Sequence, residues 1–251
     1  MTGYAQALAG FLTAVVWLAP GLASWAGVPA AAPEPQVIRR TLQWPAGTRE
    51  HALELSNITG AVTIVGEDRA DVSVIATRTV TRQGAADDPG PTPDFRQQTD
   101  ALLVCGDARR CGCHVDSSKS ERWYDDDRTR VRTEFEVHVP RAITLDVCTV
   151  NGDLIATLTT APHDSSEFRT VNGRVSVTLP ASLSADLRLR TVHGGIYTDF
   201  ETTQLPSRGT TDRRNGRFVY RSDRYASVRV GSGGPELRLE TVNGDVQVRK
   251  K

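Results

Sequence analysis

Two short runs hold the side chains best suited to catalysis or metal binding. Residues 121–127 (ERWYDDD) gather four carboxylates around Trp123 and Tyr124. Calcium loops alternate their ligands and contain a turn glycine. This run has neither, so a solvated charge run beside a partly buried aromatic pair is favoured over a calcium site or a sugar-stacking surface. The second run, His163-Asp164-Ser165, is not a triad, because neighbours in an extended chain point to opposite faces. We predict a loop there, no catalytic residue and no bound cofactor.

The cysteines offer a third kind of chemistry. The chain has four, Cys105, Cys111, Cys113 and Cys148. A metal site built from them and His114 would need C-x₂₋₄-C ligand spacing, which C-x-C-H does not provide. We therefore predict no metal site, and disulfides instead. A bridge between Cys111 and Cys113 would be strained, which leaves two pairings. Of these we favour Cys105–Cys111 across a short loop, with Cys113–Cys148 as a longer tie.

Composition limits the classes to which the chain can belong. Its 251 residues include 30 basic and 30 acidic side chains, which gives no electrostatic signature for nucleic acid. The apolar fraction of 39% is enough for one sizeable core and excludes a disordered chain. The 27 Thr and 26 Val favour pleated sheet over helix. No stretch repeats apolar residues with a period of 3.6. We predict an all-β protein.

The N-terminal segment is distinct from the rest. No charged side chain occurs among residues 1–33, and an apolar stretch from Leu8 to Leu22 is broken by Pro20-Gly21. This is typical of a signal peptide, and small residues allow cleavage after Ala26 or Ala30. We predict a signal peptide over residues 1–30. The alternative is an uncleaved anchor, since the stretch approaches the length that spans a bilayer. In both cases the rest of the chain lies outside the cytoplasm: periplasmic, at the cell surface or secreted.

The remaining chain reads as one domain. We expect a linker and lead-in over residues 31–48, then a single β-repeat domain over 49–251 with a cysteine-containing loop region at 101–130. Apolar and polar residues alternate from Leu53 to Leu55, from Val62 to Ile64 and from Val72 to Ile75, between turn residues. A further alternating run, Val131–Val139, ends at Pro140, which cannot donate to a sheet.

A four-residue motif recurs along the domain. Thr-Val-Asn-Gly begins at Thr149, Thr170 and Thr241, and the related Thr-Val-His-Gly begins at Thr191. The first three copies along the chain are 21 residues apart, and residues 56–62 form a degenerate earlier copy. Apolar alternation flanks every copy, so each unit is a strand, a corner and a strand. The predicted corner residues are Asn151, Gly152, Asn172, Gly173, His193, Gly194, Asn243 and Gly244.

This repetition indicates stacking. Asn and Gly tolerate positive φ, so each pair permits a tight corner. Corners in a fixed frame suggest a solenoid, in which each coil covers its apolar face against the next. We expect a solenoid-like stack of short strands with Val150, Val171 and Val192 in one inward column and Asn151, Asn172 and His193 in an outer corner column. The alternative is a sandwich of antiparallel hairpins.

Arginine is the other conspicuous residue type. There are 27 Arg against three Lys, and many Arg alternate with apolar residues. Alternation in a strand puts guanidinium groups on one outer face, where Arg188, Arg190 and Arg238 could bind an anionic polymer. The alternative is pairing with Asp and Glu on adjacent strands. Neutral overall charge favours pairing.

The repeats resemble a known family. The tail 231–246 (GSGGPELRLETVNGDV), the run 135–140 (FEVHVP) and the TVNGD repeats look like the bacterial putative-adhesin family, also called the toastrack domain. The likeness covers residues ~50–251. It implies an all-β, right-handed, solenoid-like exported domain without established catalytic activity, associated in some members with envelope-stress regulators. Relatives often carry a cysteine pair in the position of Cys105 and Cys111. The chain departs from the pattern at His193-Gly194-Gly195, and Cys113 and Cys148 are additions.

These observations lead to one functional hypothesis and two alternatives. We expect an exported, non-enzymatic structural or adhesin-like interaction module of the bacterial cell envelope. Its partner would be an envelope protein or polymer, not nucleic acid, and it would meet the membrane only through an uncleaved N-terminus. The alternatives are an envelope-stress sensor subunit and a polysaccharide-active enzyme on a β-helix scaffold, which would need carboxylates or basic residues converging on one groove.

Overall fold

The structure is a computed structural model. It describes residues 34–44, 47–48, 51–82, 90–108, 111–113, 129–162, 164–206, 210–214, 217–221 and 225–251. These belong to one compact unit, Pro33–Lys251. The expected signal peptide and the run at 121–127 lie outside the described residues, as does His163. Within the described ranges every regular element is a strand, which confirms the all-β prediction, and no helix is long and apolar enough to cross a membrane.

The described residues form nineteen strands, in chain order. Their bounds are β1 Gln36–Leu42, β2 Ala52–Ser56, β3 Val62–Glu67, β4 Val72–Arg82, β5 Asp94–Gln97, β6 Ala101–Cys105, β7 Thr129–Pro140, β8 Thr144–Cys148, β9 Leu154–Thr157, β10 Ser166–Arg169, β11 Val175–Leu179, β12 Ala185–Arg190, β13 Ile196–Thr198, β14 Thr203–Gln204, β15 Thr210–Arg214, β16 Arg217–Arg221, β17 Ala226–Val230, β18 Glu236–Glu240 and β19 Val246–Lys250.

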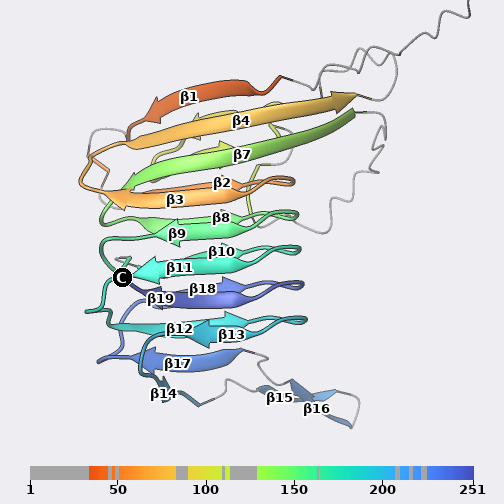
Figure 1. Cartoon of the computed structure of the whole chain (residues 1–251). Helices are drawn as coiled ribbons and strands as arrows, with labels where there is room; N and C mark the ends of the chain where they lie inside the picture. Colours follow the sequence, from red (N-terminus) through yellow and green to blue (C-terminus); the bar gives the residue numbers. More distant parts are fainter. Residues whose placement is uncertain are drawn as a thin grey trace, which may run out of the picture. The chain divides into compact units, whose positions relative to one another are not determined.

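Seventeen of these strands form two large sheets. The eight-stranded sheet has the order β1-β4-β7-β3-β9-β11-β19-β13, and the nine-stranded sheet has the order β14-β17-β12-β18-β10-β8-β2-β6-β5. Strands β15 and β16 form a separate two-stranded sheet. Figure 1 shows the strands of these two sheets stacked above one another, with β18 and β19 between the level of β10 and β11 and that of β12 and β13.

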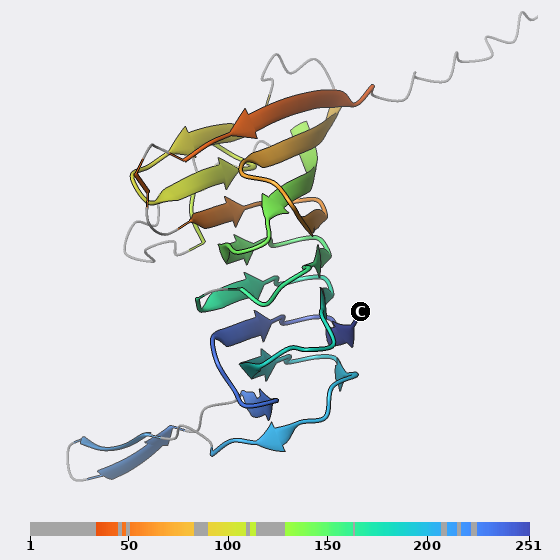
Figure 2. The ribbon, with the colours of Figure 1, turned by 90° about the vertical axis from the view of Figure 1, so that its left-hand side faces the viewer.

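The centre of the two sheets is a parallel stack of five rungs. A rung is a strand of the nine-stranded sheet, a corner, and the next strand, which lies in the eight-stranded sheet. In spatial order the rungs are β2–β3, β8–β9, β10–β11, β18–β19 and β12–β13, and the order is the same in both sheets. All pairings between neighbouring rungs are parallel. The solenoid-like prediction is therefore confirmed for this part, and Figure 2 shows it from the side.

The C-terminal rung is out of sequence order. Strand β18 pairs with β10 on one side, with Phe168 opposite Leu239, and with β12 on the other, with Leu187 opposite Leu237. Strand β19 likewise pairs with β11 and β13. The last repeat of the chain therefore lies between the second and third Thr-Val-Asn/His-Gly copies.

Antiparallel pairing occupies both ends of the stack. At one end β4 pairs antiparallel with β1 and β7, and β5 with β6; at the other, β17 pairs antiparallel with β12 and β14. Strand β1 falls within 31–48, the range expected to be linker and lead-in. Ile38 and Leu42 of β1 pack against the core, so the β-structure begins at Gln36 rather than at residue 49.

The core lies between the sheets and is built from columns of equivalent residues. Val62, Leu154, Val175 and Val246 are neighbours across β3, β9, β11 and β19, and none has measurable exposure. The facing sheet supplies its own columns, which include Phe168 between Val147 and Leu239. Burying each such side chain contributes about 1.5–3 kcal/mol. Strand alternation thus holds the rungs in register and sends every second side chain outward.

Candidate functional site

The corners form one continuous column on the outside of the stack. Parallel bridges join Thr59 to Asn151, Asn151 to Asn172, Asn172 to Asn243, and Asn243 to His193. The corner residues expected from the sequence therefore do come together. The order is not that of the sequence, because Asn243 lies between Asn172 and His193.

The corner amides bond to one another. Nδ2 of Asn172 donates to Oδ1 of Asn151 over 2.7 Å, and Nδ2 of Asn243 donates to Oδ1 of Asn172 over 2.7 Å. At the third copy the imidazole Nδ1 of His193 lies 3.1 Å from Oδ1 of Asn243. His193 thus replaces an asparagine in the ladder without interrupting it, and all four side chains are exposed.

The valines of the motif do not point inward as expected. Val150, Val171 and Val192 are 39%, 37% and 49% exposed. The threonines before Val150, Val171 and Val242 are the inward residues: Thr149, Thr170 and Thr241 are at most 3% exposed. Thr191, before Val192, is half-buried. Alternation allows only one of two neighbours to face the interior. The threonine takes that place because its hydroxyl has a buried partner.

That partner is the glycine carbonyl of the neighbouring rung. Oγ1 of Thr170 donates to the carbonyl of Gly152 over 2.9 Å, and Oγ1 of Thr241 donates to the carbonyl of Gly173 over 2.8 Å. Thr191 donates in the same way to Gly244, over 2.8 Å. Leaving such a half-buried carbonyl unpaired would cost up to about 1–3 kcal/mol, so this bond explains a polar residue inside the corner.

The glycines are required because successive corners touch. A Cβ on Gly173 would lie 2.1 Å from the carbonyl oxygen of Gly152, and one on Gly244 would lie 2.1 Å from that of Gly173. The backbone of Gly173 also has φ 157°, which L-residues rarely adopt. Gly194 meets Gly244 in the same manner. Each motif residue therefore has one position: Thr inward, Val outward, Asn in the ladder and Gly at the contact.

Two parallel rows of side chains result, and we call them together the corner stripe. Its aliphatic row is Ile58, Val150, Val171, Val242 and Val192, of which the first and fourth are half-buried and the others exposed. Its polar row is Thr59, Asn151, Asn172, Asn243 and His193. The stripe contains no carboxylate, guanidinium or ammonium group. The next residues along the chain are charged, but Asp153 and Arg174 pair with each other at 3.1 Å, and Asp245 accepts a bond from the amide of Gly195.

The three arginines proposed to bind anions also come together. Arg188, Arg190 and Arg238 lie on the outer face of the nine-stranded sheet, on the adjacent strands β12 and β18. Their guanidinium carbons lie 4.6, 5.7 and 5.6 Å from the ring centroid of Tyr225. Sequence reasoning missed Tyr225, because no pattern links it to these strands.

Each of these arginines faces a carboxylate. Arg188 lies 3.6 Å from Glu236, Arg190 lies 2.9 Å from Glu240, and Arg238 lies 3.2 Å from Glu236 and 3.7 Å from Glu167. Tyr225 donates its hydroxyl to Glu240. Burial, and then this bond, raises the pKa of Tyr225. The geometry favours mutual pairing over anion binding by this face.

The two disulfides attach the segment that contains Cys111 and Cys113 to strands β6 and β8 of the nine-stranded sheet. The structure pairs Cys105 with Cys111 and Cys113 with Cys148, with Cα–Cα distances of 5.1 and 5.6 Å. The amide of Cys113 donates to Glu54 over 2.9 Å, and Arg169 donates to the carbonyl of Cys113 over 2.9 Å.

One group in the described residues has metal-ligand types. Single ligand atoms of Glu54, Cys113 and Asp146 lie within 4.8 Å of one another. A disulfide sulfur supplies no thiolate, and thiolate is the form that binds metals. With Cys113 joined to Cys148, this group does not fit a metal ion.

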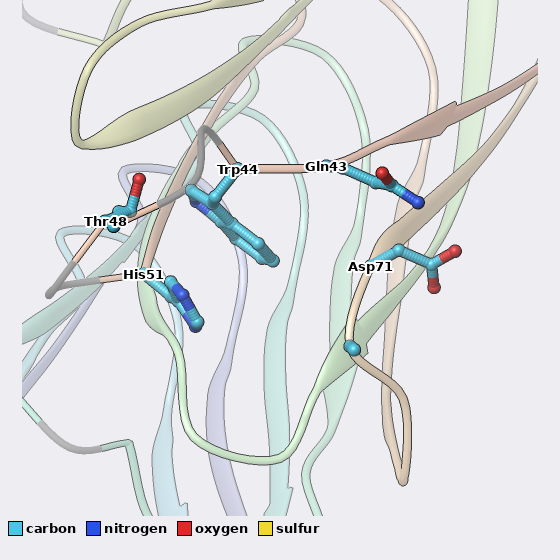
Figure 3. A pocket seen from close by; sticks show the side chains of 7 residues that line it. Gln43, Trp44, Thr48, His51 and Asp71 are labelled. Carbon is cyan, nitrogen blue, oxygen red and sulfur yellow. The ribbon is translucent and has the colours of Figure 1, made fainter.

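A shallow pocket near the start of the domain was not expected from the sequence. It has a volume of about 540 Å³ and is lined by residues around Trp44, His51 and Asp71 (Figure 3). The rings of Trp44 and His51 stack with centroids 4.4 Å apart. Two of its polar side chains are engaged elsewhere: Thr48 donates to the carbonyl of Thr99, and Asp71 pairs with Arg69 at 2.8 Å. The pocket is therefore a weaker candidate than the corner stripe.

Comparisons with known proteins add little. No protein-family model matches the sequence, and no curated protein matches it either. One similar solved structure is a "putative cell adhesion protein" from Clostridium sporogenes, with 12% identity, a TM-score of 0.49, and coverage of 87% of this chain and 100% of that chain. Another is a "putative adhesin" from Bacteroides fragilis, with 11% identity, a TM-score of 0.21, and coverage of 87% and 99%. Likenesses this remote carry no argument about function.

Proposed function

We propose that the chain is an exported, non-enzymatic interaction module of the bacterial cell envelope, structural or adhesin-like, and that the corner stripe is its contact surface. The observation that carries the proposal is the stripe itself. Single exposed aliphatic side chains are ordinary, but a row of them on consecutive rungs is a continuous apolar surface of the kind that marks interaction sites.

The chemistry of the stripe suits binding. Valine methyl groups offer apolar contact, and asparagine amides offer hydrogen bonds without exchanging protons at neutral pH. The rung-to-rung bonds hold these groups in fixed positions, so little conformational entropy is lost when a partner binds.

Export is supported by the N-terminal sequence and by the cysteines. The uncharged residues 1–33 with their apolar stretch are typical of a signal peptide. Disulfides persist in oxidising compartments, and the structure joins all four cysteines in pairs.

An array of envelope polymers and glycans tests the proposal. The purified chain is applied to isolated cell-wall material and to immobilised glycans, and bound protein and released sugar are measured together. Binding without release is expected. Release of sugar would make the chain an enzyme, and binding to nothing on the array would remove the proposed function.

A further inference from the structure

We propose that the corner stripe binds a single neutral polysaccharide strand, lying along the stack with about one sugar unit per rung. This rests on the proposed function and names its ligand class. Three kinds of partner could contact such a stripe: a folded protein, an extended peptide or a glycan. The size of the stripe and the hydrogen bonds within it distinguish between them.

A folded protein needs a broader surface. Five rungs about 4.8 Å apart span roughly 19 Å, and the stripe is two side chains wide. Stable protein interfaces bury about 800 Å² per partner. A stripe of this size suits a ligand that is itself one chain wide.

An extended peptide would bind by adding a strand through its backbone. At the corners those backbone groups are already bonded between rungs. The amide of Asn172 donates to the carbonyl of Val150 over 2.7 Å, and the amide of Asn243 donates to the carbonyl of Val171 over 2.8 Å. These rung-to-rung bonds leave no free strand edge at Asn172 and Asn243 for a peptide to pair with, so the side chains are the main groups that can contact a ligand here.

Those side chains match a sugar chain. An amide group has two N–H donors and two acceptor lone pairs on its oxygen. Asn172 uses one N–H toward Asn151 and one lone pair toward Asn243, which leaves one donor and one acceptor for ligand hydroxyls. The adjacent valine methyls can pack against the C–H faces of the rings. Hydroxyls and apolar faces that repeat along one strand are the chemistry of a polysaccharide.

The stripe also favours uncharged ligands over anionic ones. It holds no guanidinium or ammonium group to attract uronate or phosphate groups, and the guanidinium of Arg174, three residues after Val171, is paired with Asp153. Burying an unpaired anion against valine would be costly. A neutral strand is therefore preferred over an anionic one.

Calorimetric titration of the purified chain with oligosaccharides tests the inference. The probes are neutral β-1,4-linked gluco- and N-acetylglucosamine oligomers of two to six units, with hexagalacturonate as the anionic comparison. Affinity for at least one neutral series should rise with length and level off at about five units, because the stripe has five rungs about 4.8 Å apart. Equal affinity for dimer and hexamer, or preference for hexagalacturonate, would overturn the inference.

Paired variants locate the site. Val171→Arg with Val242→Arg should weaken neutral binding by about tenfold or more. The matched control is Ile155→Arg, because Ile155 is 37% exposed on β9 but lies outside the stripe. Circular dichroism checks that each variant folds. If the stripe variant binds cell-wall material as wild type does, the corner stripe is not the contact surface, although the chain is still an interaction module. If wild type binds no probe and no envelope polymer, the glycan inference and the proposed function both fail.

Discussion

Nδ2 of Asn243 donates a 2.7 Å hydrogen bond to Oδ1 of Asn172, a residue 71 positions earlier in the chain. The bond joins the last repeat to the second. Because the rung containing Asn243 is paired on both sides, the C-terminal strands complete the stack from within rather than extend it.

Because the corner glycines are in contact, adding one methyl group at such a glycine should lower the stability of the protein strongly. Gly173→Ala places its Cβ against the Gly152 carbonyl at a backbone conformation that alanine disfavours, and should lower the free energy of unfolding by about 3 kcal/mol or more. Gly47 is the control: it has φ 90° and a Cβ added there would meet nothing within 4 Å, so Gly47→Ala should cost only about 1–2 kcal/mol. Urea denaturation measures both. Equal effects would show that the corners do not touch.

The two disulfides should differ in their contribution to stability. Cys113–Cys148 closes a separation of 35 residues and Cys105–Cys111 one of 6. Loop-closure entropy then gives about 4 kcal/mol for the first and about 2 kcal/mol for the second. The paired variants Cys113→Ala with Cys148→Ala and Cys105→Ala with Cys111→Ala are compared by urea denaturation under oxidising conditions. A larger loss for the second pair would contradict this ranking.

The raised pKa of Tyr225 predicts that the protein loses stability at high pH. Burial and the bond to Glu240 raise the pKa of its phenol above the ordinary 10.0. Above that pH the unfolded chain releases a proton that the folded chain still holds. The stabilisation is therefore present below about pH 10 and is lost as pH rises through the folded-state pKa.

The slope of unfolding free energy against pH above 10 measures this effect. Tyr225→Phe should flatten the slope, because it removes the phenol whose pKa is raised. Identical slopes for the wild type and Tyr225→Phe would show that the phenol is not perturbed.

The arginine face should not bind anionic polymers. Arg188, Arg190 and Arg238 each lie within 3.7 Å of a glutamate, so their charges are paired within the protein. Changing these three arginines together with Glu167, Glu236 and Glu240 to glutamine keeps the net charge and should leave retention on an anionic polymer column unchanged. A clear loss of retention in a variant that still folds would instead assign anion binding to this face. Reversal to glutamate is less informative, because it would add repulsion from Glu167, Glu236 and Glu240.

Sequence reasoning identified the strands and the repeated corners because both depend on local patterns. Alternation marked β2, β3, β4 and β7, and Asn-Gly pairs marked the rungs. It placed the valines wrongly, because the inward preference of Thr241 comes from a bond to Gly173, whose position depends on stacking. It also missed the order of rungs and the placement of Tyr225 over three arginines, since neither leaves a pattern in the chain.

Methyl–methyl nuclear Overhauser effects test the order of the rungs most directly. Neighbouring rungs are about 4.8 Å apart, and rungs separated by one other are about twice as far. In a selectively methyl-labelled sample, Val242 should show cross-peaks to both Val171 and Val192, with none between Val171 and Val192. A direct cross-peak between Val171 and Val192, with Val242 contacting neither, would contradict the inserted C-terminal rung and the corner stripe built on it.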